Sequence, residues 1–137
     1  MTLFPFWKQE QPESCVPACV RIILASHNIV RSEAEIYQCC ETDVDGTLPS
    51  AAARCIRSFG LPVRSERLSR GIEALRTHLS NSQAIVYINL APLLGVQTIH
   101  AVIVASIQSQ EGLISVIDPS FLPNGQRRWS IGLFEIG

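Results

Sequence analysis

A chain of 137 residues, 47% of them hydrophobic, can bury the core of one domain, so we expect a single domain over residues 1–137. The net charge of −1 and the scattered arginines exclude the basic surface that nucleic-acid binding requires. The start, MTLFPFWKQE, is not a signal peptide, and the longest apolar stretch, residues 84–96, is too short to cross a bilayer, so we expect a cytoplasmic protein with no direct membrane insertion.

Helices are predicted through the first half of the chain. The first runs from about Cys15 to Ser26 and turns an apolar face inwards. The second begins at Ser32, whose hydroxyl forms a capping box with Glu35. A third runs from about Pro49 to Phe59 and stops at Gly60, which adopts a left-handed cap at little cost.

Strands are predicted in the second half, after one more amphipathic helix over residues 72–79. Three β-branched runs, AIVYINL, IHAVIVASI and LISVID, are separated by turn material, which is typical of an antiparallel sheet. Helices first and strands second predict an α+β fold, with N-terminal helices packed on a C-terminal antiparallel β-sheet. The last segment, which begins with Arg127, Arg128 and Trp129, has no assigned role.

Cys15 is the first candidate for chemistry, because it stands where a hydrophilic lead-in meets an apolar helical run. In a first helical turn, unpaired backbone N–H groups and the helix dipole favour the thiolate, which is the nucleophilic form of cysteine. Pro17 supports this register, since proline is tolerated in the first turn and not further in. A small helix-capping residue without reactivity is the alternative reading of this position.

The chain has five cysteines, and no two of them form a CxxC pair. Neither a disulfide framework nor a zinc knuckle is indicated, so reduced thiols are expected. Four are interpreted as small core residues: Cys19, Cys39, Cys40 and Cys55. Thiol redox or metal chemistry is an alternative hypothesis, but adjacent cysteines point in different directions from a helix and make a tetrahedral site awkward.

A nucleophilic thiol usually needs a base, and the chain offers three histidines. His27 lies about 18 Å along the helix from Cys15, too far to touch its sulfur. His78 lies on the polar side of its predicted helix. His100 opens an apolar strand, where strand ends commonly present functional groups, although a strand histidine is also commonly a core residue.

A pairing argument gives His100 a partner. If residues 101–107 and 113–117 form a hairpin that turns near positions 109 and 110, the partner of His100 falls at about position 118 or 119. Asp118 would hold the imidazole in one orientation and stabilise the imidazolium. The alternative is that Asp118-Pro119-Ser120 is only a turn signal.

Thiol attack on a carbonyl creates an oxyanion, which needs a donor besides the Cys15 backbone N–H. Gln9 and Gln11 both precede Cys15 closely enough to supply a side-chain amide. Their spacing alone does not choose between them.

Taken in order, these motifs resemble a known family. Gln9, Ser14-Cys15 and Pro17-Ala18-Cys19 before an apolar helix are similar to the opening motif of the bacteriocin-processing, double-glycine leader peptidases, which are papain-like cysteine peptidases often fused to ABC exporters. The same family's order is followed by four later motifs: Asp45-Gly46-Thr47, Phe59-Gly60-Leu61, His100 before a hydrophobic strand, and Asp118-Pro119. The likeness extends from about Gln9 to Phe134.

The resemblance implies a papain-like fold with Cys15 as nucleophile, His100 as general base and then acid, and Asp118 as its orienting partner. It also implies Gln9, rather than Gln11, as the oxyanion donor. The implied substrate is a peptide or precursor protein, cut after a small pair such as Gly-Gly, with no metal and no cofactor. A separately encoded ABC exporter is a further implied partner, since the chain resembles a free-standing version of the domain.

Val16 departs from the family pattern, in which glycine commonly follows the cysteine directly. A catalytically weakened papain-like domain that binds a peptide or a transporter partner without cleavage is therefore the alternative function. Acyl transfer to an acceptor other than water is a related enzymatic alternative.

Overall fold

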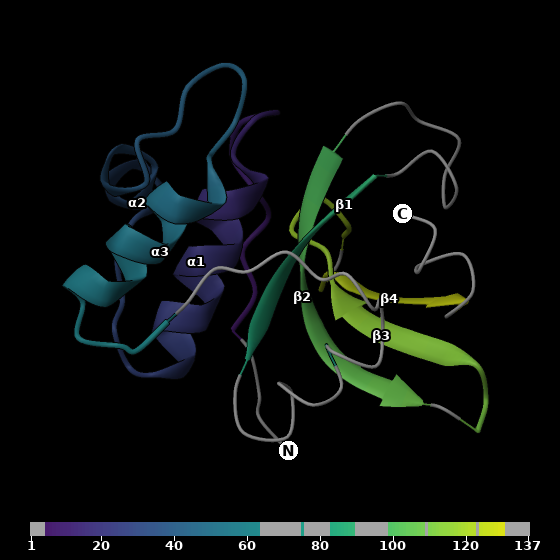
Figure 1. Cartoon of the computed structure of the whole chain (residues 1–137). Helices are drawn as coiled ribbons and strands as arrows, with labels where there is room; N and C mark the ends of the chain where they lie inside the picture. The colour runs from purple at the N-terminus through teal and green to yellow at the C-terminus, as the bar shows by residue number, and fades with distance from the viewer. Residues whose placement is uncertain are drawn as a thin grey trace. The chain divides into compact units, whose positions relative to one another are not determined.

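The computed structural model describes residues 5–63, 75, 83–89, 99–108, 110–122 and 124–130. The chain divides into two compact units, residues 1–66 and residues 67–137. Among the described residues, the first unit contains three helices and the second a four-stranded antiparallel sheet (Figure 1). This order confirms the α+β class. That the two units make up one domain stays a prediction.

The first unit is built around α1, Cys15–Ser26, which packs against both α2, Glu33–Cys39, and α3, Pro49–Ser58 (Figure 1). α1 is apolar around most of its circumference, and the side chains of residues 16–20 and 22–24 are buried. The central helix of this unit therefore owes its stability to packing on several sides rather than to one amphipathic face.

Local signals fix the helix ends close to the predicted positions. Ser32 caps α2 by accepting a hydrogen bond from the Glu35 backbone N–H at 3.2 Å. Pro49 is the first residue of α3, where a missing N–H costs nothing. Asn28, with a φ of 65°, and Gly60, with a φ of 89°, follow α1 and α3 in the left-handed conformation.

A disulfide joins Cys39, the last residue of α2, to Cys55 in α3, so the expectation of reduced thiols is wrong for this pair. Their Cα atoms are 5.4 Å apart, inside the range that a disulfide spans. Because the two residues belong to different helices, their contact depends on helix packing, which cysteine spacing does not show. The interpretation as buried core residues is confirmed for Cys19, Cys40 and Cys55, whereas Cys39 is partly exposed.

The second unit is a sheet whose strands lie in chain order, each antiparallel to the next: β1, Ala84–Asn89; β2, Ile99–Gln108; β3, Leu113–Ile117; β4, Gln126–Ser130. The sequence does not predict β4, because QRRWS has only one large apolar residue, and its strand pairs with β3 along its whole length. The helix predicted over residues 72–79, with His78, lies outside the described residues apart from Leu75.

A buried cluster stabilises this sheet, with side chains from all four strands and from Leu75. The β2–β3 register shifts by one residue at a β-bulge between Val104 and Ser106. The bulge changes the alternation of side chains, so Val104 and Ile107, three residues apart, both contact the cluster. The buried members are Leu75, Ile88, Val102, Val104, Ile114, Val116 and Trp129.

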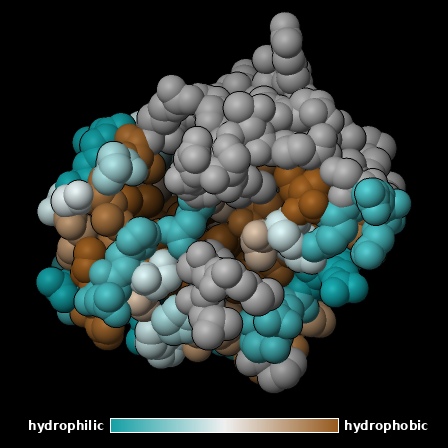
Figure 2. Space-filling view, turned by 90° about the horizontal axis from the view of Figure 1, so that it is seen from below, coloured by the Kyte–Doolittle hydropathy of each residue, from teal (hydrophilic) through white to brown (hydrophobic). Residues whose placement is uncertain are grey.

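The surface mixes apolar and polar residues. Val44 and Leu48 are 83% and 72% exposed, and apolar and hydrophilic residues lie side by side on the face shown in Figure 2. The helices that the structure describes all fall short of the length and apolar character needed to cross a bilayer.

Candidate active site

Cys15 is the first residue of α1, and its side chain is partly exposed. Pro17 lies in the same first turn, so the helix begins as the sequence predicts. Ser14 occupies the N-cap position, but its side chain makes no capping hydrogen bond to the helix. The side chain of Cys15 therefore stands at the N-terminal end of α1, which is the positive end of the helix dipole.

Two further cysteines outside the disulfide, Cys19 and Cys40, differ from Cys15 by being fully buried. Burial raises the pKa of Cys40 to about 12, so its thiol stays protonated at neutral pH. Among the described cysteines outside the disulfide, Cys15 alone is accessible to a reagent in solution.

Gln9 lies in the segment that leads to α1. Its side-chain amide donates hydrogen bonds to the carbonyl oxygens of Gln11, at 2.9 Å, and Pro12, at 3.3 Å. Its Oε1 is buried without a hydrogen-bond partner among the described residues. An oxyanion would therefore have to draw an amide proton of Gln9 away from one of these carbonyls.

His100 and Asp118 are in direct contact in the second unit. His100 is the second residue of β2 and is 8% exposed, whereas Asp118 follows the end of β3 and is 1% exposed. Nε2 of the imidazole lies 2.7 Å from Oδ1 of the carboxylate. The structure thus brings together the two residues that the hairpin argument paired.

The predicted hairpin register is nevertheless wrong. Ile103 pairs with Ile117, so the position opposite His100 is Ser120 by continuation of this register, two residues beyond Asp118. Diagonal neighbours on one face of a sheet are within reach of long side chains, and this is how the imidazole meets the carboxylate.

Asp118 is fixed from several sides. Its Oδ1 also accepts hydrogen bonds from the Ser120 backbone N–H, at 2.9 Å, and the Ser120 hydroxyl, at 2.7 Å. Arg127 Nε lies 3.3 Å from Oδ2, which makes an ion pair without the alignment of a hydrogen bond. The backbone N–H of Asp118 donates to the Gly125 carbonyl at 2.7 Å.

These contacts determine the charge of Asp118. Burial opposes ionisation of Asp118, but hydrogen bonds from His100 and Ser120 outweigh it and hold the pKa of the carboxyl below its usual value. Asp118 is therefore a carboxylate that only accepts hydrogen bonds, so Nε2 of His100 carries the proton between them.

Ser120 and Arg127 are the residues of this arrangement that the sequence argument missed. Ser120 has a local signal, because an aspartate side chain commonly accepts a hydrogen bond from the backbone N–H two residues on, as in an Asx turn. Arg127 has none, since it reaches Asp118 from β4, a strand that the sequence did not predict.

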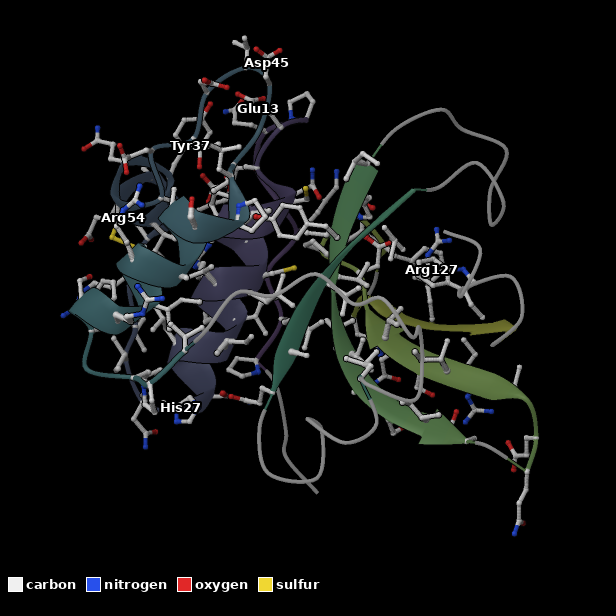
Figure 3. All side chains as sticks on the ribbon, viewed as in Figure 1. Glu13, His27, Tyr37, Asp45, Arg54 and Arg127 are labelled. Carbon is white, nitrogen blue, oxygen red and sulfur yellow. A yellow bond between two sulfur atoms is a disulfide. The ribbon has the colours of Figure 1, made fainter. Side chains whose placement is uncertain are left out.

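His27, the other described histidine, is placed too far along α1 from Cys15 to act as its base. His27 is the C-cap of α1, at the opposite end of the helix from Cys15. In Figure 3 it lies far from Glu13, two residues before the thiol. His78 lies outside the described residues. Gln9 and Cys15 belong to the first unit and His100 and Asp118 to the second, and that the two pairs act together stays a prediction.

Within the described ranges, no group of three or more His, Cys, Asp or Glu side chains is arranged to hold a metal ion.

Comparisons with known proteins identify the family. No curated protein sequence matches the chain. Among solved structures, the peptidase domain of Streptococcus ComA, a bi-functional ABC transporter involved in a quorum-sensing pathway, is similar with a TM-score of 0.78 at 17% identity, over 99% of this chain and 91% of that one.

A double-glycine motif protease from an AMS/PCAT transporter, solved in complex with the leader peptide, has a TM-score of 0.63 at 13% identity, over 98% of this chain and 85% of that one. At these identities the two structures show a shared fold. A sequence profile of the Peptidase C39 family matches residues 4–135, which is nearly the whole chain. The chain therefore belongs to the Peptidase C39 family.

Proposed function

We propose that this chain is a cysteine peptidase that removes the leader from a peptide precursor by cutting after a pair of small residues such as Gly-Gly. Cys15 is the nucleophile, His100 the general base and then acid, Asp118 its orienting partner, and Gln9 an oxyanion donor. The observation that carries the proposal is the 2.7 Å contact between His100 and the buried Asp118, in a chain whose family is a peptidase family.

The contact between His100 and Asp118 supports one assignment of the proton transfers in the proposed mechanism. Nε2 of His100 is engaged with Asp118, so Nδ1 is the nitrogen that takes the thiol proton. The thiolate then attacks the carbonyl carbon of the scissile bond, and the Cys15 backbone N–H and the Gln9 amide stabilise the oxyanion. The imidazolium returns its proton to the leaving amine, and water hydrolyses the thioester.

The substrate class rests on the two similar structures. One is a peptidase domain of an ABC transporter, and the other is a double-glycine protease in complex with a leader peptide. A leader-bearing precursor is accordingly the proposed substrate, and an ABC exporter the proposed partner. The chemistry needs no metal and no cofactor, and we place it in the cytoplasm as part of the same proposal.

A peptide-binding domain that does not cleave is the second candidate function, and two observations favour it. Val16 stands where the family commonly has glycine, directly after Cys15. The amide of Gln9 is occupied by the carbonyls of Gln11 and Pro12. Both features would weaken oxyanion stabilisation while leaving peptide binding intact.

One experiment separates the two candidates. Wild type and Cys15→Ala are incubated with a precursor peptide that contains a Gly-Gly pair, and the products are identified by mass spectrometry. We expect wild type alone to release the leader and to be inhibited by a peptide aldehyde ending in Gly-Gly. Binding of the peptide by both proteins, with no cleavage by either, would support the second candidate.

A thiol-labelling control requires no substrate. Brief treatment of the native protein with iodoacetamide should alkylate Cys15 and leave Cys19 and Cys40 unmodified, because the latter two are buried.

Acyl transfer is tested by adding an amine to the peptide-cleavage reaction. Products in which the peptide is joined to the amine, and not hydrolysed by water, would indicate acyl transfer.

A further inference from the structure

The segment from Gln9 to Ser14 joins the proposed oxyanion donor to the proposed nucleophile. Gln9 stands at its start, and Cys15 follows its last residue. The segment is a turn that precedes α1, closed by a 3.2 Å hydrogen bond from the Ser14 backbone N–H to the Gln11 carbonyl. No helix or strand fixes its shape, so contacts from other elements add to the hydrogen bonds within the segment.

One carboxylate oxygen holds both ends of this segment. Oε2 of Glu33, in α2, accepts a hydrogen bond from the Glu10 backbone N–H at 2.8 Å and lies 3.0 Å from the Ser14 hydroxyl. Glu10 follows Gln9 directly, and Ser14 precedes Cys15 directly. Glu33 thus binds the chain neighbours of Gln9 and Cys15, two of the residues that the proposed mechanism uses.

The contact with Glu33 also determines what Ser14 does at the start of α1. A serine at an N-cap position usually accepts a hydrogen bond from an N–H group of the first turn. The Ser14 hydroxyl instead accepts from the Gln11 backbone N–H at 2.9 Å and lies against Glu33 and the Gln11 carbonyl. It therefore does not cap the helix, and because Pro17, the third helical residue, has no N–H, the first-turn donors are the backbone N–H groups of Cys15 and Val16.

Burying the Glu33 carboxyl group costs desolvation free energy, and filling space at this position would not require a carboxyl group. The side chain is 2% exposed, and its Oε1 has no hydrogen-bond partner among the described residues. Burial raises the pKa of this carboxyl, against hydrogen bonds from Glu10 and Ser14. A leucine would fill a similar volume without this desolvation, so the oxygen at Oε2 is what the site gains from glutamate.

Tyr37 makes a comparable contact with Glu13, which belongs to the same segment. It lies one helical turn after Glu33, on the same face of α2, and its hydroxyl donates to Glu13 Oε2 at 2.6 Å (Figure 3). This contact raises the pKa of Tyr37 to about 12 and touches neither the neighbour of Gln9 nor that of Cys15. It therefore supplies a matched control on the same helix face.

We propose that Glu33 is a positioning residue, which sets the Gln9 amide and the Cys15 thiol in their reactive geometry by holding Glu10 and Ser14 on one oxygen. The inference rests on the proposed function of Gln9 and Cys15. An oxygen acceptor at this point is what the geometry requires, so glutamine can replace glutamate and leucine cannot.

The test compares Glu33→Leu, Glu33→Gln and Tyr37→Phe in two assays: cleavage of a Gly-Gly precursor peptide, and the rate at which iodoacetamide alkylates Cys15. We expect Glu33→Leu to lower kcat about tenfold to a hundredfold with KM within about twofold, since misplaced reacting groups lose rate rather than affinity. Glu33→Gln should restore kcat to within about threefold of wild type. Tyr37→Phe should leave kcat within about twofold.

Two outcomes would overturn the proposal: a folded Glu33→Leu protein with wild-type kcat, or Glu33→Gln as slow as Glu33→Leu. If Glu33→Leu does not fold, Ser14→Ala removes one of the two contacts, and an unchanged kcat in that variant would refute the proposal equally.

Failure of the proposed function has a different signature. In that case wild type does not cleave, or Cys15→Ala cleaves as well as wild type. The alkylation rates then still test whether Glu33 positions the thiol: a slower rate in Glu33→Leu, restored in Glu33→Gln, supports positioning, and equal rates refute it.

Discussion

The disulfide between Cys39 and Cys55 links two helices across a sequence separation of 16 residues, and opening it should destabilise the fold by an amount that this loop sets. Closing a loop of such length removes about 10 cal/mol/K of entropy from the unfolded chain, or about 3 kcal/mol at 25 °C. A chain of 137 residues that unfolds as one unit has an unfolding entropy of about 0.29 kcal/mol/K. Reduction should therefore lower Tm by about 10 °C.

The assay is thermal unfolding followed by circular dichroism, with and without a phosphine reductant. Cys39→Ala/Cys55→Ala is the matched control, and its Tm should not respond to reductant, since it has no bond to open. A wild-type Tm that stays constant, while mass spectrometry shows both thiols reduced, would refute the loop-entropy reasoning.

Three further predictions concern buried carboxyl groups. Asp118→Asn should lower kcat about 30-fold, because a neutral amide loses about 2 kcal/mol of charge-assisted hydrogen bonding to the imidazolium. Ser120→Ala should lower kcat far less, and equal losses of kcat in steady-state kinetics would contradict this. The pKa of Asp118 is lowered from 3.8, so its stabilisation is complete above that pH and is lost as pH falls through the folded value; urea unfolding of Asp118→Asn should lack this acid loss. The pKa of Glu33 is raised from 4.5, so wild-type stability should fall as pH rises from 4.5 through the folded value, and Glu33→Gln should abolish that fall in the same measurement.

Helix positions could be predicted from the sequence because their signals are local. The capping box at Ser32, the proline at Pro49 and the glycine at Gly60 each act within a few residues of a helix end, and the structure has these ends within about one residue of the prediction. The β-branched runs of β1, β2 and β3 are local in the same sense.

Features that depend on contacts between elements could not be predicted in this way. β4 forms because it pairs with β3, and the Cys39–Cys55 bond forms because α2 packs on α3. The β2–β3 register depends on a bulge that no single residue predicts. The contact of His100 with Asp118 was nevertheless within reach, because both lie at strand ends that a short hairpin brings close, and a register error of two residues falls within the span of the imidazole.

The β-bulge between Val104 and Ser106 separates the hairpin into two lengths of ladder. His100 lies near the start of β2 on one side of the bulge, and Glu111, in the exposed loop after Gln108, lies on the other side, roughly 26 Å or more along the strand at about 3.3 Å per residue. A fluorophore attached at Glu111 would sit at a separation suited to energy transfer from a labelled peptide. An insertion at Glu111 would lengthen the loop without shifting the strand register at His100. This turn is therefore a suitable position for a reporter of peptide binding.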